Sequence, residues 1–179
     1  MGFTGMFDIR QKPSYDLMKQ LEPPDCHYLN AAQGWFELGN PAEATLELAQ
    51  IGARYQTHPE VLRIQWEILA AQKKWSEALK AAQTYTQTHP NDPDGHIKHA
   101  NTLYFLGRTK EARDMALALL QRFPRHPGFL YNLACYECQM GNLKEAKEWL
   151  DKACQMGAHL HAFALRDPDL EPLRKKIKL

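Results

Sequence analysis

A pattern of alanine, glutamate and proline residues recurs along the chain at a fixed interval. Four alanines lie 34 residues apart, each directly after a glutamate: Ala44, Ala78, Ala112 and Ala146. Three prolines, Pro59, Pro93 and Pro127, keep the same interval. A period of about 20 to 50 residues is typical of proteins that stack one structural unit several times. The interval therefore constrains the fold more than any other feature of the sequence.

Each interval predicts two helices joined by a tight turn. Proline is favoured at the start of a helix, because the first helical N–H groups have no partner there. Glycine supplies the left-handed residue that ends a helix, and it fills three of the four turn positions, at Gly39, Gly107 and Gly141. We expect first helices over 26–38, 59–72, 93–106 and 127–140. We expect second helices over 41–56, 75–88, 109–122 and 143–157.

These helical hairpins predict an all-α protein that is organised as a stack. A single hairpin cannot cover its own apolar face, so neighbouring hairpins must bury those faces in one continuous core. We expect a leader with a short capping helix near 14–21 over residues 1–24, and a C-terminal capping segment over 159–179. Between them, residues 25–158 divide into four repeats, over 25–58, 59–92, 93–126 and 127–158.

The repeat motif resembles that of the tetratricopeptide-repeat (TPR) family. Residues 35–44, Trp-Phe-Glu-Leu-Gly-Asn-Pro-Ala-Glu-Ala, follow the family pattern, as do residues 131–146. The resemblance covers about residues 25–158 and implies a right-handed α-solenoid of four stacked hairpins, a TPR superhelix. Residues 167–174 resemble the short closing helix that follows bacterial TPR arrays.

Repeat two departs from the family pattern at two positions. Trp66 occupies the first-helix position where the other repeats carry a small residue, namely Ala32, Ala100 and Ala134. Lys73 replaces the turn glycine, which costs about 1 kcal/mol if its backbone is left-handed. We therefore expect repeat two to be the least regular of the four.

The family resemblance also places the binding surface. In TPR arrays the first helices line a concave groove that binds extended or helical peptides. The repeat phase places the following candidates in that groove: Asn30, Gln33, Phe36, Arg63, Glu67, Ile97, Lys98, Asn101, Tyr104, Phe105, Tyr131, Asn132 and Cys135. Leu29, Ile64, Ala71 and Cys138 lie on the same side. Carboxamides can pair with a peptide backbone, aromatic rings supply contact area, and the two basic groups can meet acids.

Two of these asparagines, Asn101 and Asn132, match positions at which chaperone-binding family members hold a peptide carboxylate. Ile97 stands where those members carry a lysine, so the complete carboxylate clamp is absent. Two interpretations stay open: the amides hold a peptide, or both are solvated groove residues.

The sequence patterns of the cysteines and histidines favour structural roles for these residues. Cys135 and Cys138 form a Cys-x-x-Cys motif without a second ligand pair, and His96 and His99 lack the glutamate of a zinc-binding helix. His58, His89 and His126 each precede a proline at a repeat junction, which favours a role in the loops. Nucleophile-elbow, phosphate-loop and dinucleotide-binding motifs are absent from the sequence. We therefore predict no catalytic residue, no cofactor and no metal site.

The overall charge and hydropathy limit the expected cellular location and the classes of binding partner. Lys and Arg total 22 against 21 Asp and Glu, a net charge of +1, which gives no general electrostatic reason to bind nucleic acid. No stretch is apolar enough for membrane insertion, and the N-terminus does not resemble a signal peptide. We expect a cytoplasmic protein with reduced cysteines, whose partners are other proteins bound through an extended or helical peptide.

Three functions remain open at the level of sequence. The first is a non-catalytic interaction module, an adaptor, scaffold or chaperone-like protein that binds a partner in the groove. The alternative is a homo-oligomeric scaffold that assembles through the ends of the solenoid or through Phe3 and Phe7 of the leader. The weakest is a thiol- or metal-dependent activity.

Overall fold

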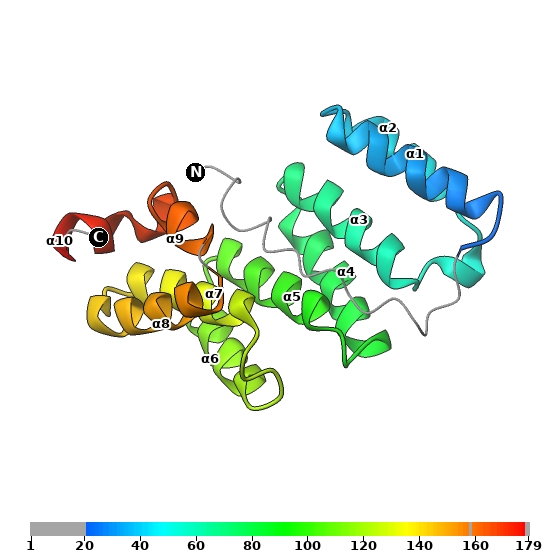
Figure 1. The fold of residues 1–179 in the computed structure, drawn as a ribbon. Helices are drawn as coiled ribbons and strands as arrows, with labels where there is room; N and C mark the ends of the chain where they lie inside the picture. The colour runs from blue at the N-terminus through cyan, green and yellow to red at the C-terminus, as the bar shows by residue number, and fades with distance from the viewer. Residues whose placement is uncertain (1–20, 158, 178–179) are drawn as a thin grey trace. The chain divides into compact units, whose positions relative to one another are not determined.

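The computed structural model describes residues 21–157 and 159–177 (Figure 1). Within these ranges the chain forms α-helices joined by short turns, and it contains no β-strand. Residues 1–20 of the predicted leader lie outside the described residues, and with them the capping helix near 14–21 apart from Leu21. The helices are α1 (Asp25–Glu37), α2 (Pro41–Ala49), α3 (Pro59–Ala71), α4 (Trp75–Thr88), α5 (Pro93–Phe105), α6 (Thr109–Leu120), α7 (Pro127–Gln139), α8 (Leu143–Met156), α9 (His159–Ala164) and α10 (Glu171–Ile177). Two 3₁₀ turns, η1 (Ala53–Tyr55) and η2 (Pro168–Leu170), complete the described part.

The first eight helices alternate as the sequence predicts, so the all-α class and the helical hairpins are confirmed. The four repeat alanines, Ala44, Ala78, Ala112 and Ala146, are fully buried. A side chain this small lets the two helices of a hairpin approach closely. The three turn glycines adopt left-handed backbone angles, with φ of 77°, 77° and 85°.

Both irregularities of repeat two have visible consequences. Lys73 has a φ of 57°, so it bears the strain that glycine avoids in the other turns. Trp66 is 1% exposed, and its indole N–H donates a hydrogen bond to the Thr102 hydroxyl at 2.7 Å. The indole therefore joins α3 to α5.

The second helix of the first repeat is shorter than predicted. We expected it to run to residue 56, but α2 ends at Ala49. The chain then turns through Gly52, whose N–H donates to the buried Asp25 carboxylate at 2.6 Å. Glycine is a poor helix residue, and this carboxylate replaces the helical partner of its N–H.

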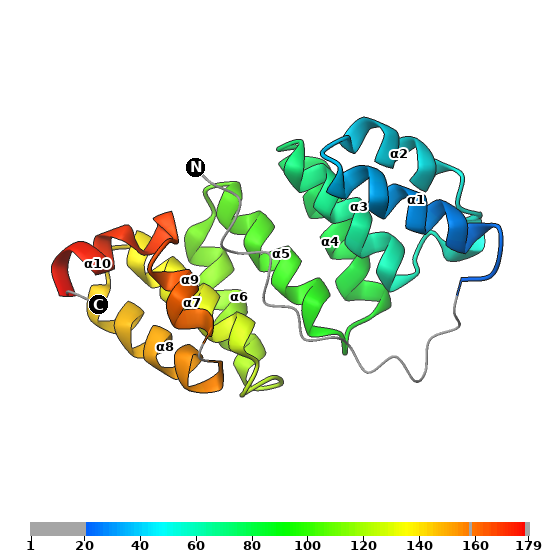
Figure 2. The same ribbon diagram turned by 45° about the horizontal axis from the view of Figure 1, so that its top comes forward.

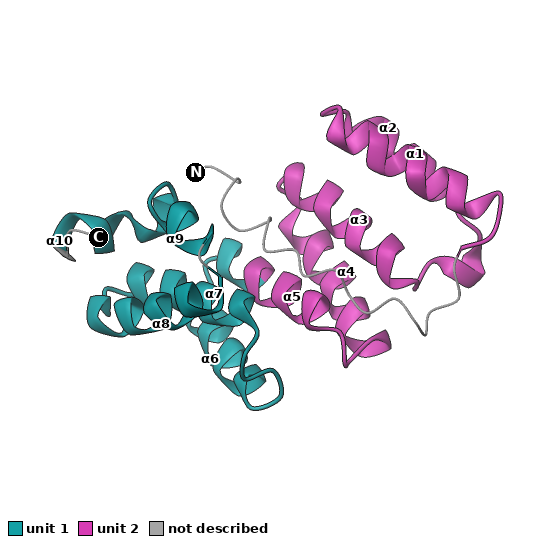
Figure 3. Ribbon diagram, viewed as in Figure 1, with its two compact units in different colours: residues 1–11, 103–179 teal, residues 12–102 magenta. Residues whose placement is uncertain are grey.

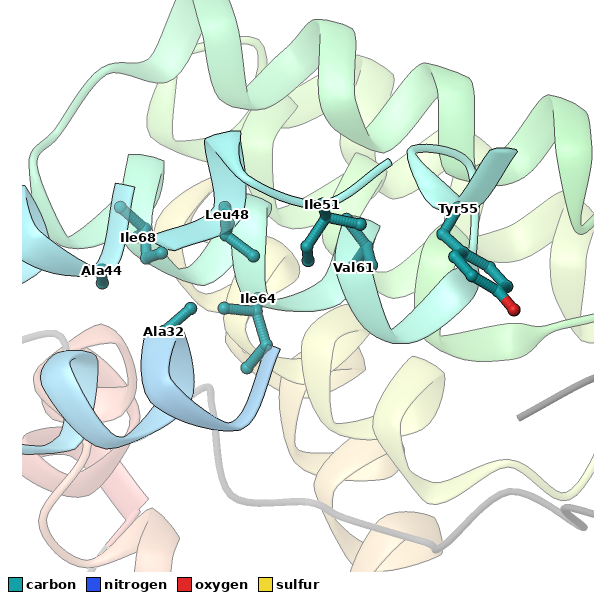
Figure 4. Close-up of a cluster of buried hydrophobic side chains, with 8 residues drawn as sticks. All are labelled: Ala32, Ala44, Leu48, Ile51, Tyr55, Val61, Ile64 and Ile68. Carbon is teal, nitrogen blue, oxygen red and sulfur yellow. The ribbon is translucent and has the colours of Figure 1, made fainter. Parts of the chain in front are cut away.

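The chain divides into two compact units, and each is described by itself (Figure 3). The described part of unit 2 comprises residues 21–102. A cluster of buried apolar side chains lies where α1, α2 and α3 meet (Figure 4). The core residues are Ala32, Ala44, Leu48, Ile51, Tyr55, Val61, Ile64 and Ile68.

The described part of unit 1 comprises residues 103–157 and 159–177, with α7 at its centre. Helices α6 and α8 pack against α7, as do η2 and α10 from the C-terminal segment. As a result, every residue from Pro127 to Cys138 is buried. Across both units, the described residues include no helix long and apolar enough to cross a membrane.

Candidate protein-binding face

The predicted groove residues fall into both units. Unit 2 holds Asn30, Gln33, Phe36, Arg63, Glu67, Ile97, Lys98 and Asn101, on α1, α3 and α5. Unit 1 holds Tyr104, Phe105, Tyr131, Asn132 and Cys135, on the end of α5 and on α7. We call the surface made by the unit 2 residues the first-helix face.

Arg63 is the first member of an ion-pair network on this face. Its guanidinium lies 2.8 Å from the Glu60 carboxylate and 3.2 Å from the Glu67 carboxylate, one turn away on either side in α3. Burial alone would lower the pKa of Arg63, but attraction to Glu67 and Glu60 outweighs it and raises the pKa. The guanidinium is therefore held as a fixed cation between two carboxylates.

Lys98 extends the network from α3 to α5. Its ammonium lies 2.8 Å from Asp94 and 3.9 Å from Glu67. It also lies 5.1 Å from the centre of the Trp66 ring, within the range of a cation–π contact. Glu67 thus stands between the two cations, and Coulomb attraction ties α3 to α5 at this point.

The network carries an excess of negative charge. Glu60, Glu67 and Asp94 contribute three negative charges against the two positive charges of Arg63 and Lys98, a balance of −1. The Asp94 side chain is 39% exposed, whereas Lys98 is only 8% exposed. A molecule that approaches this face therefore meets a carboxylate sooner than an ammonium.

The remaining unit 2 candidates differ in accessibility. Asn30 is exposed, and the Gln33 amide donates to the Glu37 carboxylate at 2.9 Å. Phe36 is half-buried because it packs against the core of Figure 4. Ile97 is also half-buried, whereas Asn101 is 2% exposed. The side chains that can reach a partner are therefore mainly those of α1 and the rim of the network.

The unit 1 candidates on α7 are buried rather than on an open surface, and two of them lie beneath the C-terminal segment. Tyr131, Asn132 and Cys135 are 0%, 1% and 0% exposed. The Tyr131 hydroxyl donates to the Asp167 carboxylate at 2.8 Å, and the Cys135 sulfur lies 3.8 Å from the same oxygen. Because all three side chains are buried, a peptide cannot contact them in this structure, and they lie outside the candidate face.

The C-terminal segment is held over α7 by further contacts. The Gln139 amide donates to the Asp169 carbonyl at 2.6 Å. Arg174 donates to the carbonyls of Ala164 and Asp167, which ties α10 to the preceding turn. The segment thus occupies the position on repeat four that the sequence analysis gave to a ligand.

The end of α5 presents an aromatic pair. The rings of Tyr104 and Phe105 lie 5.4 Å apart, and Tyr104 also lies 5.3 Å from Tyr136. Burial, reinforced by the nearby Asp169 carboxylate, raises the pKa of Tyr104. Both residues remain half-buried.

The surroundings of the cysteine and histidine motifs favour structural roles for these residues. Burial raises the pKa of the Cys135 and Cys138 thiols, which lowers their thiolate content and hence their nucleophilicity. His96 shares a hydrogen bond with the Pro90 carbonyl at 2.8 Å. The Nδ1 atoms of His58 and His126 accept N–H groups in the first turns of α3 and α7. Over residues 21–157 and 159–177, no three His, Cys, Asp or Glu side chains gather as metal ligands would.

Sequence reasoning missed three participants in these sites: Asp94, Glu60 and Asp167. Asp94 precedes Lys98 by four residues and Glu60 precedes Arg63 by three, and such pairs meet on a helix surface. That spacing could have identified both carboxylates. Asp167 lies more than 30 residues from Tyr131, and no local spacing signals their contact.

Residues 97–160 match the family model described as tetratricopeptide repeat. No curated protein matches the chain in sequence.

Three solved structures share the fold. PilF of Pseudomonas aeruginosa has a TM-score of 0.70 at 17% identity, over 86% of this chain and 69% of that one. MamA from Desulfovibrio magneticus RS-1, from residue 41 to its end, has a TM-score of 0.64 at 19% identity, over 87% of this chain and 92% of that one. A tetratricopeptide repeat protein from Parabacteroides merdae has a TM-score of 0.61 at 21% identity, over 83% of this chain and 59% of that one.

The hairpins, the buried repeat alanines and these likenesses define an α-solenoid built from helical repeats. The match to the tetratricopeptide-repeat family model extends over residues 97–160 of this solenoid.

Proposed function

We propose that this chain is a non-catalytic interaction module that holds an extended or helical segment of another protein. Repeat solenoids present broad surfaces for this purpose, and TPR proteins as a class bind other proteins. The proposed site is the first-helix face of unit 2. The role is that of an adaptor, scaffold or chaperone-like protein.

The observation that carries the proposal is the ion-pair network of Arg63, Glu67 and Lys98. Partly buried charges lose hydration, so they persist only where the geometry satisfies them. Here they stand on the successive first helices α3 and α5, in the same unit as the amides of Asn30 and Gln33 on α1. Such a rigid, polar and desolvated surface fixes the orientation of a bound segment.

The charge balance also indicates the kind of segment. Because the network carries one excess negative charge and Asp94 is its most exposed carboxylate, a lysine or arginine of the partner is favoured there. The amides of Asn30 and Gln33 can pair with backbone groups of the same segment.

Affinity capture from a lysate of the source cells tests the proposal. The face variant is Gln33→Ala/Asp94→Asn, and the matched control is Gln83→Ala/Asp114→Asn on the second helices α4 and α6. We expect the wild type and the control to retain the same partner and the face variant to lose it, with helicity unchanged in all three. Equal retention by all three proteins would rule out this face.

A homo-oligomeric scaffold is the second candidate function, and a separate observation favours it. Trp35, Leu38 and Leu46 of the first repeat are 38%, 78% and 59% exposed. The terminal repeat of a solenoid normally needs a polar outer face to stay soluble. These exposed apolar side chains therefore favour an assembly in which another copy of the chain covers the first repeat.

A further inference from the structure

The outer surface of α2 differs from that of the other second helices. Ala42, Leu46 and Ala49 follow one another at helical spacing and are all exposed. At the positions of Leu46 the later repeats carry Lys80, Asp114 and Glu148, and at those of Ala42 they carry Ser76, Lys110 and Lys144. At the positions of Ala49 they carry Gln83, Leu117 and Asp151, so the first repeat has an apolar stripe where the other repeats are polar except at Leu117.

A cavity borders this stripe. Because α2 ends at Ala49, it leaves part of α3 uncovered, and a cavity of about 190 Å³ remains between the two helices. Leu48, Ala49, Val61, Ile68 and Leu69 supply most of its apolar lining. Ala49 is exposed, so the cavity is open at the α2 stripe. An apolar cavity of about 150 Å³ accepts benzene, so this one has room for a large apolar side chain.

The charged side chains of the α1 and α2 hairpin, which carries the stripe, are all negative. From residue 22 to residue 53 the sequence contains five acidic residues and neither lysine nor arginine. Glu37, Glu43 and Glu47 belong to the hairpin of α1 and α2, which Figure 2 shows side by side. An occupant of the stripe is therefore expected to be apolar with basic neighbours.

The C-terminal segment of the same chain has this chemistry. Leu165 is 46% exposed and is followed by the exposed Arg166. Lys175 and Lys176 on α10 are also exposed, against a single exposed acid, Glu171, which pairs with Lys175. Among the described residues, the large exposed apolar side chains are confined to the first repeat and to the C-terminal end, Met156 and Leu165.

We propose that the α2 stripe and its cavity bind the C-terminal segment of a second copy of this chain. Leu165 enters the cavity, and Arg166 and Lys176 lie toward Glu43 and Glu47. The two surfaces are different, so the contact is head-to-tail, and an assembly that does not close into a ring keeps one free surface at each end. This inference rests on the second candidate function, the homo-oligomeric scaffold, and identifies the two surfaces that meet in it.

Complementation between two variants tests the proposal. The receptor variant, Leu46→Glu/Ala49→Gln, introduces residues that repeats four and two carry at the matching positions, Glu148 and Gln83. The donor variant is Leu165→Gln/Arg166→Glu. A control, Lys80→Glu/Gln83→Glu, places the same kind of change on α4.

Light scattering over a concentration series measures the mass of each protein and of the mixture. We expect the mass of the wild type and of the control to rise with concentration, while each double variant stays at the mass of one chain. An equimolar mixture of the two variants retains one intact receptor and one intact donor, so it should reach twice the mass of one chain and no more.

Two results would overturn the proposal in different ways. A wild type that keeps the mass of one chain at every concentration refutes the homo-oligomeric function together with this contact. A wild type that associates while the mixture of variants does not, or variants that associate as the wild type does, refutes only the head-to-tail contact.

Discussion

Replacement of Trp66 by alanine separates what the repeat pattern predicts from what the structure predicts. Alanine fills the matching position in the other three repeats and is fully buried in each of them. The pattern alone therefore predicts that Trp66→Ala is tolerated or even stabilising. In the structure the indole is 1% exposed and bonded to Thr102, so its removal leaves a void beside α5.

The expected loss follows from this burial. Truncation of a buried aromatic side chain to alanine costs about 3 to 5 kcal/mol of unfolding free energy. Trp66→Phe keeps most of the volume but loses the indole N–H, a loss of about 1 kcal/mol for the hydrogen bond. For a chain of this size, the alanine variant should melt roughly 6 to 20 °C lower than the wild type.

Urea unfolding followed by circular dichroism at the helical minimum measures both variants against the wild type. The order of stability should be wild type, then Trp66→Phe, then Trp66→Ala. If Trp66→Ala lost less than about 1 kcal/mol, the indole would not be filling the space assigned to it. The repeat pattern would then be the better guide.

Three further predictions follow from single residues. Lys73→Gly should raise the unfolding free energy by about 0.5 to 1 kcal/mol in urea titrations, because its φ is positive, whereas Gly107→Lys should lower it by a similar amount. Asp167→Ala should speed the reaction of the Cys135 thiol with Ellman's reagent, because the carboxylate holds the segment that covers this thiol; an unchanged rate would contradict that role. Burial raises the pKa of Asp169 above its usual 3.8, so the folded state binds this proton more tightly than the unfolded chain and loses stability as the pH rises through that interval. Asp169→Asn should therefore be more stable than the wild type in urea at pH 7 and equal to it at pH 3.

The helical hairpins were predictable because their determinants are local and repeated. Each repeat alanine and turn glycine recurs at the same interval, and the structure buries the former and gives the latter a positive φ. Lys73 keeps the same backbone conformation although its side chain disfavours it. The hairpin geometry is therefore set by the surrounding packing, which outweighs the preference of one residue.

The sequence contains one signal for the early end of α2, and the prediction did not use it. Gly52 lies inside the predicted helix and signals a weak point, but the partner of its N–H is Asp25, which is 27 residues earlier. Helix periodicity gives no information about a contact between residues so far apart in the sequence. The prediction therefore extended the helix to residue 56.

The site was less predictable than the fold because it depends on what covers each helix. Repeat phase places Tyr131 and Arg63 at equivalent positions, yet Tyr131 is buried under Asp167 while Arg63 stays near the surface. A repeat pattern treats all units alike. The repeat pattern therefore cannot predict where the C-terminal segment lies, because that segment does not repeat.

Site-specific photo-crosslinking tests the central claim, that the first-helix face of unit 2 holds a partner protein. A benzophenone amino acid replaces Ile97 on this face in one protein and Lys80 on the second helix α4 in another, and both are irradiated in lysate of the source cells. The account predicts that a partner protein crosslinks at position 97 and not at position 80, and that the Gln33→Ala/Asp94→Asn change abolishes the crosslink. Equal crosslinking from both positions, or none from position 97, would contradict it.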